Sequence, residues 1–392
     1  MGKGLKLFTP EREKRYIINS KPFRRLADKT QVVPNIQRET EMEKFQRNSQ
    51  IRTRLTHSLE VASISHEIAL NIKNIKTKWN NNYHINPIIC ENASLLHDVA
   101  MSGFGHVAET LLNKVFGKRF GVFYEANASN LILIEKDLPE LSDLTIVSTI
   151  KYPYKFKNKL NGKGLYKKHY KKYIPILNDI IEIQNGNNPI KRTRTFECDI
   201  MEIADDISYL FSDLVDMLYF QYKMGDERIK SNVILDLIKK HKITDPNIYI
   251  YLKEILLNNN LDKLEELRDL VILNVKYSKR ENKILLESKE YNKLLLLLRE
   301  ITWVYYIKKY SITTEDALSK KVEEYFLFLA NNIDNTILIE KNILSNTRQK
   351  QYKKAIRKGQ KKKAIKYLVI SLSELTDTYL YQQLNLYLKN KK

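Results

Sequence analysis

The stretch LTHSLEVASISHEIALNI, residues Leu55–Ile72, predicts the fold class of this chain. Its apolar residues recur every three or four positions, which gives a helix one apolar side. A helix of this kind buries that side against other elements, so we expect the segment to lie in the core of a helical protein. On the apolar side we expect Leu59, Ala62, Ile68 and Ala69.

The same periodicity recurs along the rest of the chain. Glycine and proline are scarce, at 11 and 9 of 392 residues, and leucine, isoleucine, glutamate and lysine dominate, which favours helices. We therefore predict an all-α architecture with surface loops at Ile75–Asn86, Lys151–Gly164 and Asn185–Arg194. Further helices are expected at Ile88–Leu96, Val107–Val115, Leu141–Ile150, Ile200–Tyr219, Ser231–Lys240, Leu261–Leu273, Glu281–Lys308, Thr314–Ile333 and Ile365–Leu388.

Every segment with recognisable chemistry precedes about residue 220. We predict a functional core over residues 1–225 and a helical C-terminal region over residues 226–392 that packs on the core. The sequence contains no dinucleotide fingerprint, no Walker loop and no internal repeat.

The composition is typical of a soluble globular protein, with 43% hydrophobic and 29% charged residues. No stretch approaches the roughly 20 apolar residues of a membrane-spanning helix. The charged N-terminus, MGKGLKLFTPEREKRY, lacks the apolar core of a secretory signal. Cys90 and Cys198 are too far apart to suggest a disulfide framework or a cysteine zinc site. We expect a cytoplasmic protein.

The formal net charge of +21 has two explanations. The abundance of lysine can reflect the base composition of the genome, or the surface can attract polyanions such as triphosphates or nucleic acid. The densest basic run, RQKQYKKAIRKGQKKKAIK at Arg348–Lys366, is either a solvated helix face or a surface for a phosphate backbone.

Four residues far apart in the sequence suit a metal site. His57 opens the first helix, and His97 and Asp98 end an apolar helix before a turn with glycine. Asp205 lies inside an otherwise apolar helix, where a buried carboxylate needs a partner or a metal. Two imidazoles and two carboxylates suit a divalent transition metal or Mg²⁺, with positions left open for water and phosphate oxygens.

The segments around these residues resemble the motifs of one family, the HD-domain deoxyguanosine triphosphate triphosphohydrolases (dGTPases) and related dNTP triphosphohydrolases. The resemblance covers about residues 10–220 and agrees in order and spacing. The matching segments are FRRLADKTQVV (Phe23–Val33), RTRLTHSLEVA (Arg52–Ala62), LLHDVAMSGFGHVAE (Leu95–Glu109), KYP with its preceding isoleucine (Ile150–Pro153) and ADDISYLFSDLVD (Ala204–Asp216).

The resemblance implies an HD-domain helical phosphohydrolase fold and a metal-dependent reaction. A dNTP, with dGTP favoured, would be hydrolysed to the deoxynucleoside and inorganic triphosphate. The metal would be Mn²⁺ or Mg²⁺, or another transition metal, and the protein would form a homo-oligomer. The implied metal ligands are His57, His97, Asp98 and Asp205. Asp205 is preferred to Asp206, which is then a surface carboxylate or a partner of the ligands.

The resemblance also implies residues that bind substrate. Arg54 and Lys151 would contact the phosphates, and Tyr152 would lie near them. Tyr209, one helical turn after Asp205, would pack against the deoxyribose and leave no room for a 2′-hydroxyl. Gln31 and Asp213 would bind the 3′-hydroxyl.

The implied catalytic pair is His106 and Glu109, with His106 acting at the α-phosphate and Glu109 orienting it. The central motif departs from the family pattern, usually HDxGHxPFGHxxE. Ala100 and Met101 replace a glycine and a histidine, and Gly103 replaces a proline. Ala126 stands where some relatives carry another histidine. His106 is therefore the only histidine left in this motif for acid–base work.

Two alternatives remain. An HD phosphohydrolase can act on another nucleotide, such as a nucleoside monophosphate, a cyclic nucleotide or (p)ppGpp. The chain can also be a catalytically impaired, nucleic-acid-binding or regulatory HD protein that binds single-stranded nucleic acid through its basic surface.

Overall fold

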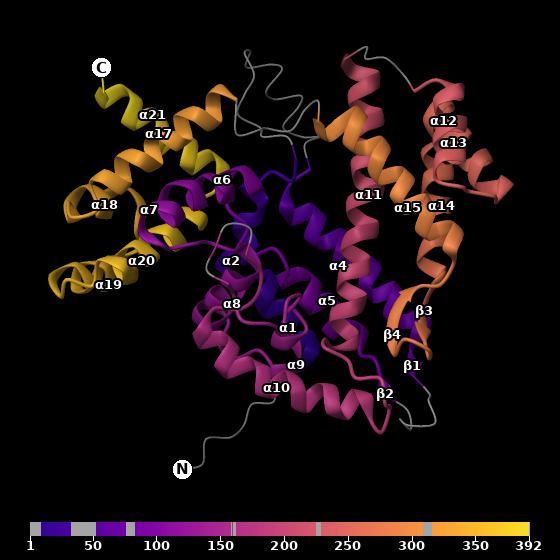
Figure 1. Cartoon of the computed structure of the whole chain (residues 1–392), viewed down its shortest axis with the longest axis horizontal. Helices are drawn as coiled ribbons and strands as arrows, with labels where there is room; N and C mark the ends of the chain where they lie inside the picture. Colours follow the sequence, from indigo (N-terminus) through magenta and orange to yellow (C-terminus); the bar gives the residue numbers. More distant parts are fainter. Residues whose placement is uncertain are drawn as a thin grey trace.

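The computed structural model describes residues 9–32, 52–75, 83–157, 159, 162–224, 229–308 and 316–391. Within these ranges the chain is almost entirely helical (Figure 1), and the named strands form two short antiparallel pairs. The predicted all-α fold class is confirmed. No helix in these ranges is both long and apolar enough to cross a membrane.

Three helices form the centre of the fold: α4 (Arg54–Ile72), α5 (Pro87–Leu96) and α11 (Phe196–Met224). α4 packs against both α5 and α11, and these two also contact each other. The side chains of Thr53 and Asn86 accept hydrogen bonds from backbone amides in the first turns of α4 and α5. These N-caps fix where both helices begin.

The apolar side of α4 differs in part from the prediction. Ala62, Ile68 and Ala69 are buried as expected, but Leu59 is 45% exposed. The prediction for Leu59 was wrong because the buried side of α4 is centred on the row that contains His57. Leu59 follows His57 by two positions and so points about 200° away around the helix.

One hydrophobic cluster joins α4 and α5 to the helices that surround them on one side. α1 packs on α5, and η1 packs on α4. The surrounding helices are α1 (Pro10–Ile18), α2 (Lys21–Arg24), η1 (Arg25–Asp28), α8 (Ala126–Asp137), α9 (Asp143–Val147) and α10 (Lys167–Asn185).

The C-terminal region packs on the core in two separate places, on opposite sides of Figure 1. The first group, which joins α4 and α11, is α12 (Ser231–Lys240), α13 (Pro246–Asn258), α14 (Leu261–Leu273), β3 (Val275–Ser278), β4 (Lys283–Leu286), α15 (Lys289–Thr302) and the π-helix η3 (Trp303–Ile307). The predicted boundary between residues 225 and 226 lies outside the described residues, and the division into two parts remains a prediction.

The second C-terminal group packs on a segment that begins within the central motif and continues beyond it. That segment comprises α6 (Gly105–Leu112), η2 (Asn113–Gly117) and α7 (Lys118–Phe120). The helices packed on it are α17 (Ala317–Asn331), α18 (Thr336–Ile343), α19 (Asn346–Arg357), α20 (Lys361–Ser373) and α21 (Asp377–Lys391). The candidate site thus lies between two C-terminal groups.

The prediction of one helix over Glu281–Lys308 was wrong at its start. β3 and β4 form an antiparallel hairpin in which Val275 pairs with Leu286, and α15 begins at Lys289. In β4 buried Ile284 and Leu286 alternate with more exposed neighbours, which is the period of a strand. The amphipathic helix pattern begins only after this hairpin.

Other boundaries also differ. The helix expected at Ile365–Leu388 is broken between Ser373 and Asp377, and that expected at Leu141–Ile150 contracts to α9. The loop expected at Ile75–Asn86 contains β2 (Tyr83–His84), which pairs with β1 (Asn74–Ile75). No predicted helix covers α1, α2, α7, α8, α10, α13 or α18, and α19 was expected only as one interpretation of the basic run Arg348–Lys366. Val33 and Thr314, the ends of two predicted segments, lie outside the described residues.

Candidate metal and phosphate site

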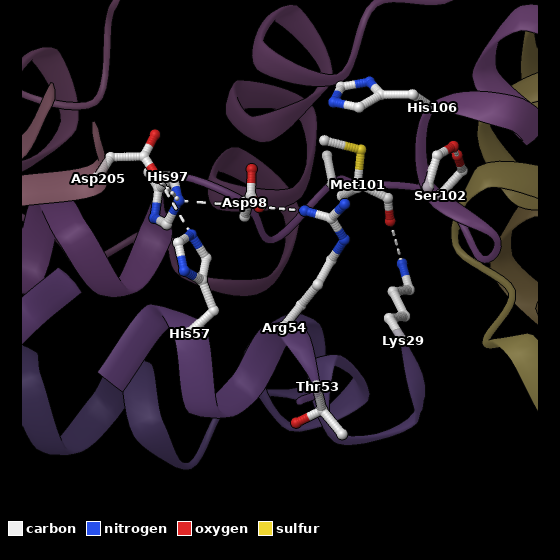
Figure 2. A network of polar contacts seen from close by, with 12 residues as sticks. Lys29, Thr53, Arg54, His57, His97, Asp98, Met101, Ser102, His106 and Asp205 are labelled. Atoms are coloured by element: carbon white, nitrogen blue, oxygen red, sulfur yellow. Dashed lines mark hydrogen bonds and ion pairs between the residues drawn. The ribbon is translucent and has the colours of Figure 1, made fainter. Parts of the chain in front are cut away.

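Helices α4, α5 and α11 bring His57, His97 and Asp205 together (Figure 2). One ligand atom from each residue lies within 4.8 Å of the other two. Asp205 Oδ1 lies 3.1 Å from His57 Nε2 and 3.5 Å from His97 Nε2. The imidazole rings meet edge to face, with 5.4 Å between their centroids. Three residues of the predicted ligand set therefore converge on one point.

The hydrogen bonds of His97 leave Nε2 free to act as a ligand. His97 Nδ1 donates to the carbonyl oxygen of Ser94 at 2.6 Å, so Nε2 carries the lone pair of the neutral ring. His97 is 2% exposed, and its Nε2 has no hydrogen-bond partner among the described residues. A buried nitrogen without a partner is costly unless something else binds it, and a metal ion would satisfy it.

His57 is oriented in the same way. Ser208 Oγ donates its one proton to the Glu60 carboxylate at 3.1 Å, so it accepts a hydrogen bond from His57 Nδ1 at 3.3 Å. This fixes the proton on Nδ1 and leaves Nε2 facing Asp205. Hydrogen bonds to the outer nitrogen are the usual means of orienting a histidine ligand.

Asp98 lies beside the three converging residues. Its Oδ2 is 3.7 Å from His97 Nε2 and accepts a hydrogen bond from Arg54 Nη1. Burial alone would raise the pKa of the Asp98 carboxyl, but His97 and Arg54 outweigh burial and lower this pKa below its usual range. Asp98 is therefore ionised, and it remains a predicted fourth ligand.

Lys151 supplies a second cation at the same place. Its Nζ lies 2.5 Å from Asp205 Oδ2. Burial would raise the pKa of Asp205, but the charges of Lys151 and His97 lower it well below its usual range. The pKa of Lys151 is raised, because its attraction to Asp205 outweighs its burial. Both groups thus keep their charges inside the protein.

Most of these groups line a cavity of about 460 Å³. This volume lies within the range of small-molecule sites. The predicted site residues that line the cavity are Gln31, Arg54, His57, Asp98, His106, Lys151, Tyr152, Asp205 and Tyr209. His97, Glu109 and Asp213 are not among the lining residues.

His106 stands at the cavity with a 73% exposed side chain. Its Nδ1 lies 3.2 Å from Glu109 Oε2, and Glu109 Oε1 accepts from the backbone amide of Ala126 at 3.3 Å. The carboxylate therefore holds one ring nitrogen of His106 and leaves the other available. In Figure 2 the Met101 side chain lies between His106 and Arg54.

Tyr209 and Asp213 occupy successive turns of α11, as predicted, but Asp213 is buried behind the cavity wall. Burial, together with the charge of Asp216, raises the pKa of Asp213 to about 8. Asp213 Oδ2 and the buried Gln31 Oε1 lack hydrogen-bond partners in the described part of the chain. Gln31 lines the cavity, although this amide oxygen itself is buried.

The sequence did not point to several residues of the cavity wall: Thr30, Phe104, Asn127, Lys163, Trp303 and Ile307. Trp303 is 56% exposed although it lines the cavity. It lies in η3, which is a π-helix. π-Helices are rare in proteins, and those that occur are frequently found at functional sites. The sequence of this segment gives only the signal of an amphipathic helix. Next to it Asp206 pairs with Arg299 at 3.1 Å, and both side chains are largely exposed.

The comparisons with known proteins agree with this geometry. The HD domain family matches residues 54–159, the range that contains His57, His97 and Asp98. This part of the chain is therefore similar to HD domains.

Several curated proteins that resemble this chain are named deoxyguanosinetriphosphate triphosphohydrolase-like proteins. One from Corynebacterium glutamicum is 29% identical over 246 residues, which covers 60% of this chain and 50% of the relative. One from Mesorhizobium japonicum is 34% identical over 236 residues, 55% of this chain and 47% of the relative. One from Rickettsia typhi is 25% identical over 305 residues, which covers 72% of this chain and 71% of the relative. The chain spans about half the length of the first two relatives.

Among solved structures, a hypothetical protein from Aquifex aeolicus has a TM-score of 0.37 and 15% sequence identity. The match covers 82% of this chain and 60% of that one.

Proposed function

We propose that this protein hydrolyses a deoxynucleoside triphosphate to the deoxynucleoside and inorganic triphosphate, with a divalent cation. One observation carries the proposal. The buried Nε2 of His97, which has no hydrogen-bond partner among the described residues, faces His57 and Asp205 beside a cavity of about 460 Å³ that Arg54 and Lys151 line. The names of the curated relatives support a deoxynucleotide substrate, with dGTP favoured.

His57, His97 and Asp205 would hold the cation, with Asp98 as a fourth ligand. These nitrogen and carboxylate oxygen donors suit Mn²⁺ and Mg²⁺, and other transition metals fit as well. A cation bound there would neutralise phosphate charge and lower the pKa of a bound water.

The phosphates would bind to the cationic side chains of the cavity. Arg54 and Lys151 stand beside the metal ligands, and Lys163 lines the wall near Tyr152. The guanidinium of Arg54 is paired with Asp98, and the ammonium of Lys151 is paired with Asp205. These ion pairs would hold both cations in place before the substrate binds. Preformed donors of this kind stabilise developing charge without having to reorganise.

In the proposed reaction water attacks the α-phosphorus, and the bond from this phosphorus to the 5′-oxygen breaks. The water oxygen ends on triphosphate, and a proton must reach the 5′-oxygen of the departing deoxynucleoside. His106 is suited to deliver this proton, because Glu109 holds its Nδ1 and the ring stands open to the cavity.

The nucleoside would occupy the opposite part of the cavity. Tyr209 would pack on the deoxyribose, and Gln31 would bind the 3′-hydroxyl, because it lines the cavity and its amide oxygen has no hydrogen-bond partner among the described residues. Asp213 would reach that hydroxyl only after a movement of the wall. Trp303 and Ile307 form an apolar surface on which the flat base can stack.

The test is a turnover assay with all four dNTPs and GTP, with Mn²⁺ and with Mg²⁺, and with the product identified. We expect inorganic triphosphate and the deoxynucleoside, and slower turnover of GTP than of dGTP. The variant His97→Ala, which lacks a predicted metal ligand, is the negative control. Release of pyrophosphate or of a monophosphate would assign the same site to another nucleotide reaction.

A second candidate function is binding of single-stranded nucleic acid, and it rests on the corner between α19 and α20. The exposed side chains there are Lys350, Lys354, Arg357, Lys358, Lys361, Lys362, Lys363 and Lys366, and Lys361 pairs with Asp334. Arg348, in contrast, is buried and bonded to Glu374. Affinity for an oligonucleotide that falls steeply with salt, without nucleotide turnover, would favour this function. A homo-oligomer and a cytoplasmic location remain predictions.

A further inference from the structure

Residues 373–377, called the connector below, join α20 to α21. The connector lies in the C-terminal region, but it contacts the candidate site at several points. Asp377, at its end, is 2% exposed. Its Oδ1 accepts from the backbone amide of Phe104 at 2.8 Å. Its Oδ2 accepts from the amide of Thr30 at 3.0 Å and from the Thr30 hydroxyl. Thr30 and Phe104 both line the cavity.

The bond to Phe104 holds an unusual turn. Phe104 has φ of 57°, in the left-handed region that residues with a side chain rarely adopt. The next residue begins α6, which carries His106 and Glu109. A strained backbone persists only where its surroundings hold it, and the Asp377 carboxylate is one such restraint.

The connector also fits directly against Gly103. A Cβ atom at this position would lie 2.9 Å from the carbonyl oxygen of Leu375 and 3.1 Å from the carbonyl carbon of Thr376. The position of Gly103 is the one at which the resembling motif has proline. Glycine has no Cβ atom, so it leaves room at position 103 for the connector to pack against the backbone.

Lys29 ties the connector to the same turn from the other side. Its side chain is 1% exposed and donates to the carbonyl oxygens of Met101 and Ser373, the latter at 3.3 Å. Figure 2 shows the contact with Met101. Glu374 in turn pairs with Arg25 at 3.2 Å, which fixes the connector to η1.

We propose that Asp377 is a positioning residue of the active site. It holds the turn before His106 and the segment before Gln31 in one arrangement, through a carboxylate that never touches substrate. The predicted metal ligands lie on α4, at the C-terminal end of α5 and on α11, and in the described part of the chain none of them bonds to Asp377, so we expect metal binding not to depend on it. The expected loss of kcat rests on the proposed function. The expected loosening of the turn at Phe104 does not.

The experiment compares Asp377→Asn and Asp377→Ala with the control Asp334→Asn, an exposed carboxylate of the same C-terminal group. It measures Mn²⁺ binding, amide hydrogen exchange of the peptide over residues 101–108, and kcat and KM. A second variant, Gly103→Ala, displaces the connector from the opposite side.

We expect both Asp377 variants and Gly103→Ala to bind Mn²⁺ as the wild type does. Exchange in residues 101–108 should be roughly tenfold faster or more. For Asp377→Ala, kcat should fall on the order of 10–100-fold, more than KM rises, because His106 is misplaced. Asp377→Asn, which keeps one acceptor, should lose less, and Asp334→Asn should change nothing.

Unchanged exchange in folded, Mn²⁺-binding Asp377→Asn would overturn the proposal, as would equal losses of kcat in Asp377→Asn and in the surface control. If Asp377→Ala fails to fold, Asp377→Asn and Gly103→Ala decide the question by the same measurements. If the wild type hydrolyses no dNTP, the proposed function fails, and the exchange comparison still tests the role of Asp377.

Discussion

His97 Nε2 and Asp205 Oδ1 face each other at 3.5 Å where α5 meets α11. With the neutral ring of His97 donating from Nδ1 to Ser94, both facing atoms are acceptors. Two acceptors directed at each other inside a protein need a proton or a cation between them. Burial lowers the pKa of His97, but Asp98 and Asp205 outweigh burial and raise it. The same carboxylates that attract a proton there would attract a divalent cation.

Removal of His106 should separate chemistry from binding. We expect His106→Ala to keep Mn²⁺ and substrate binding and to lower kcat by about 10²-fold or more, the usual contribution of a general acid or base. Steady-state kinetics and Mn²⁺ titration measure the two effects. Glu109→Gln should lower kcat less, because the amide oxygen can still hold Nδ1. Wild-type kcat in His106→Ala would refute its assignment.

Trp303 should determine how well the nucleoside binds. Trp303→Ala is expected to raise KM for dNTPs by roughly tenfold with little change in kcat, because base–aromatic stacking contributes about 1–3 kcal/mol. Trp303→Phe is the matched control and should retain most of the affinity. Inhibition by inorganic triphosphate, which has no base, should be equal in all three proteins. A loss of triphosphate inhibition in Trp303→Ala would show that the wall has been disrupted instead.

Asp213 should make stability depend on pH. Burial and the charge of Asp216 raise its pKa to about 8 in the folded protein, from about 3.9 in the unfolded chain. The folded state therefore keeps a proton that the unfolded state loses, so this contribution to stability is complete below about pH 4 and is lost as pH rises through 8. Asp213→Asn stays neutral and should gain stability relative to wild type between pH 5 and pH 9.

Urea unfolding at several pH values measures this difference, which should grow by at most about 1.4 kcal/mol per pH unit. Asp334→Asn, at an exposed carboxylate, should give a difference that does not vary with pH. A constant difference for Asp213→Asn would mean that Asp213 is already ionised in the folded protein at neutral pH.

The sequence predicted those features that depend on short-range patterns. The 3.6-residue period located α4, α5, α11, α12 and α14, and the motif segments marked His57, His97 and Asp205, which the fold brings together. α19 has few apolar residues, and it was expected only as one interpretation of the basic run Arg348–Lys366, as a solvated helix face without bounds of its own.

Features that depend on long-range packing could not be predicted. The exposure of Leu59 follows from which row of α4 meets α5 and α11. Trp303 reaches the cavity only because α15 packs on α11, and nothing near it in the sequence indicates a ligand. The same holds for Asp377, a single carboxylate whose partners Thr30 and Phe104 lie far away in the chain. The alternation of buried and exposed residues in β4 covers only four positions, and the amphipathic pattern of α15 follows it directly, so the sequence was interpreted as one helix.

The proposed function requires that His57, His97 and Asp205 bind one divalent cation beside the cavity. The most direct measurement is a calorimetric titration of the metal-free wild type with Mn²⁺, repeated for His97→Ala and for His84→Ala, a histidine exposed on β2. We expect one Mn²⁺ per chain in the wild type and in His84→Ala, and loss of this binding in folded His97→Ala. Equal binding of Mn²⁺ by all three proteins would show that these three residues do not form the metal site.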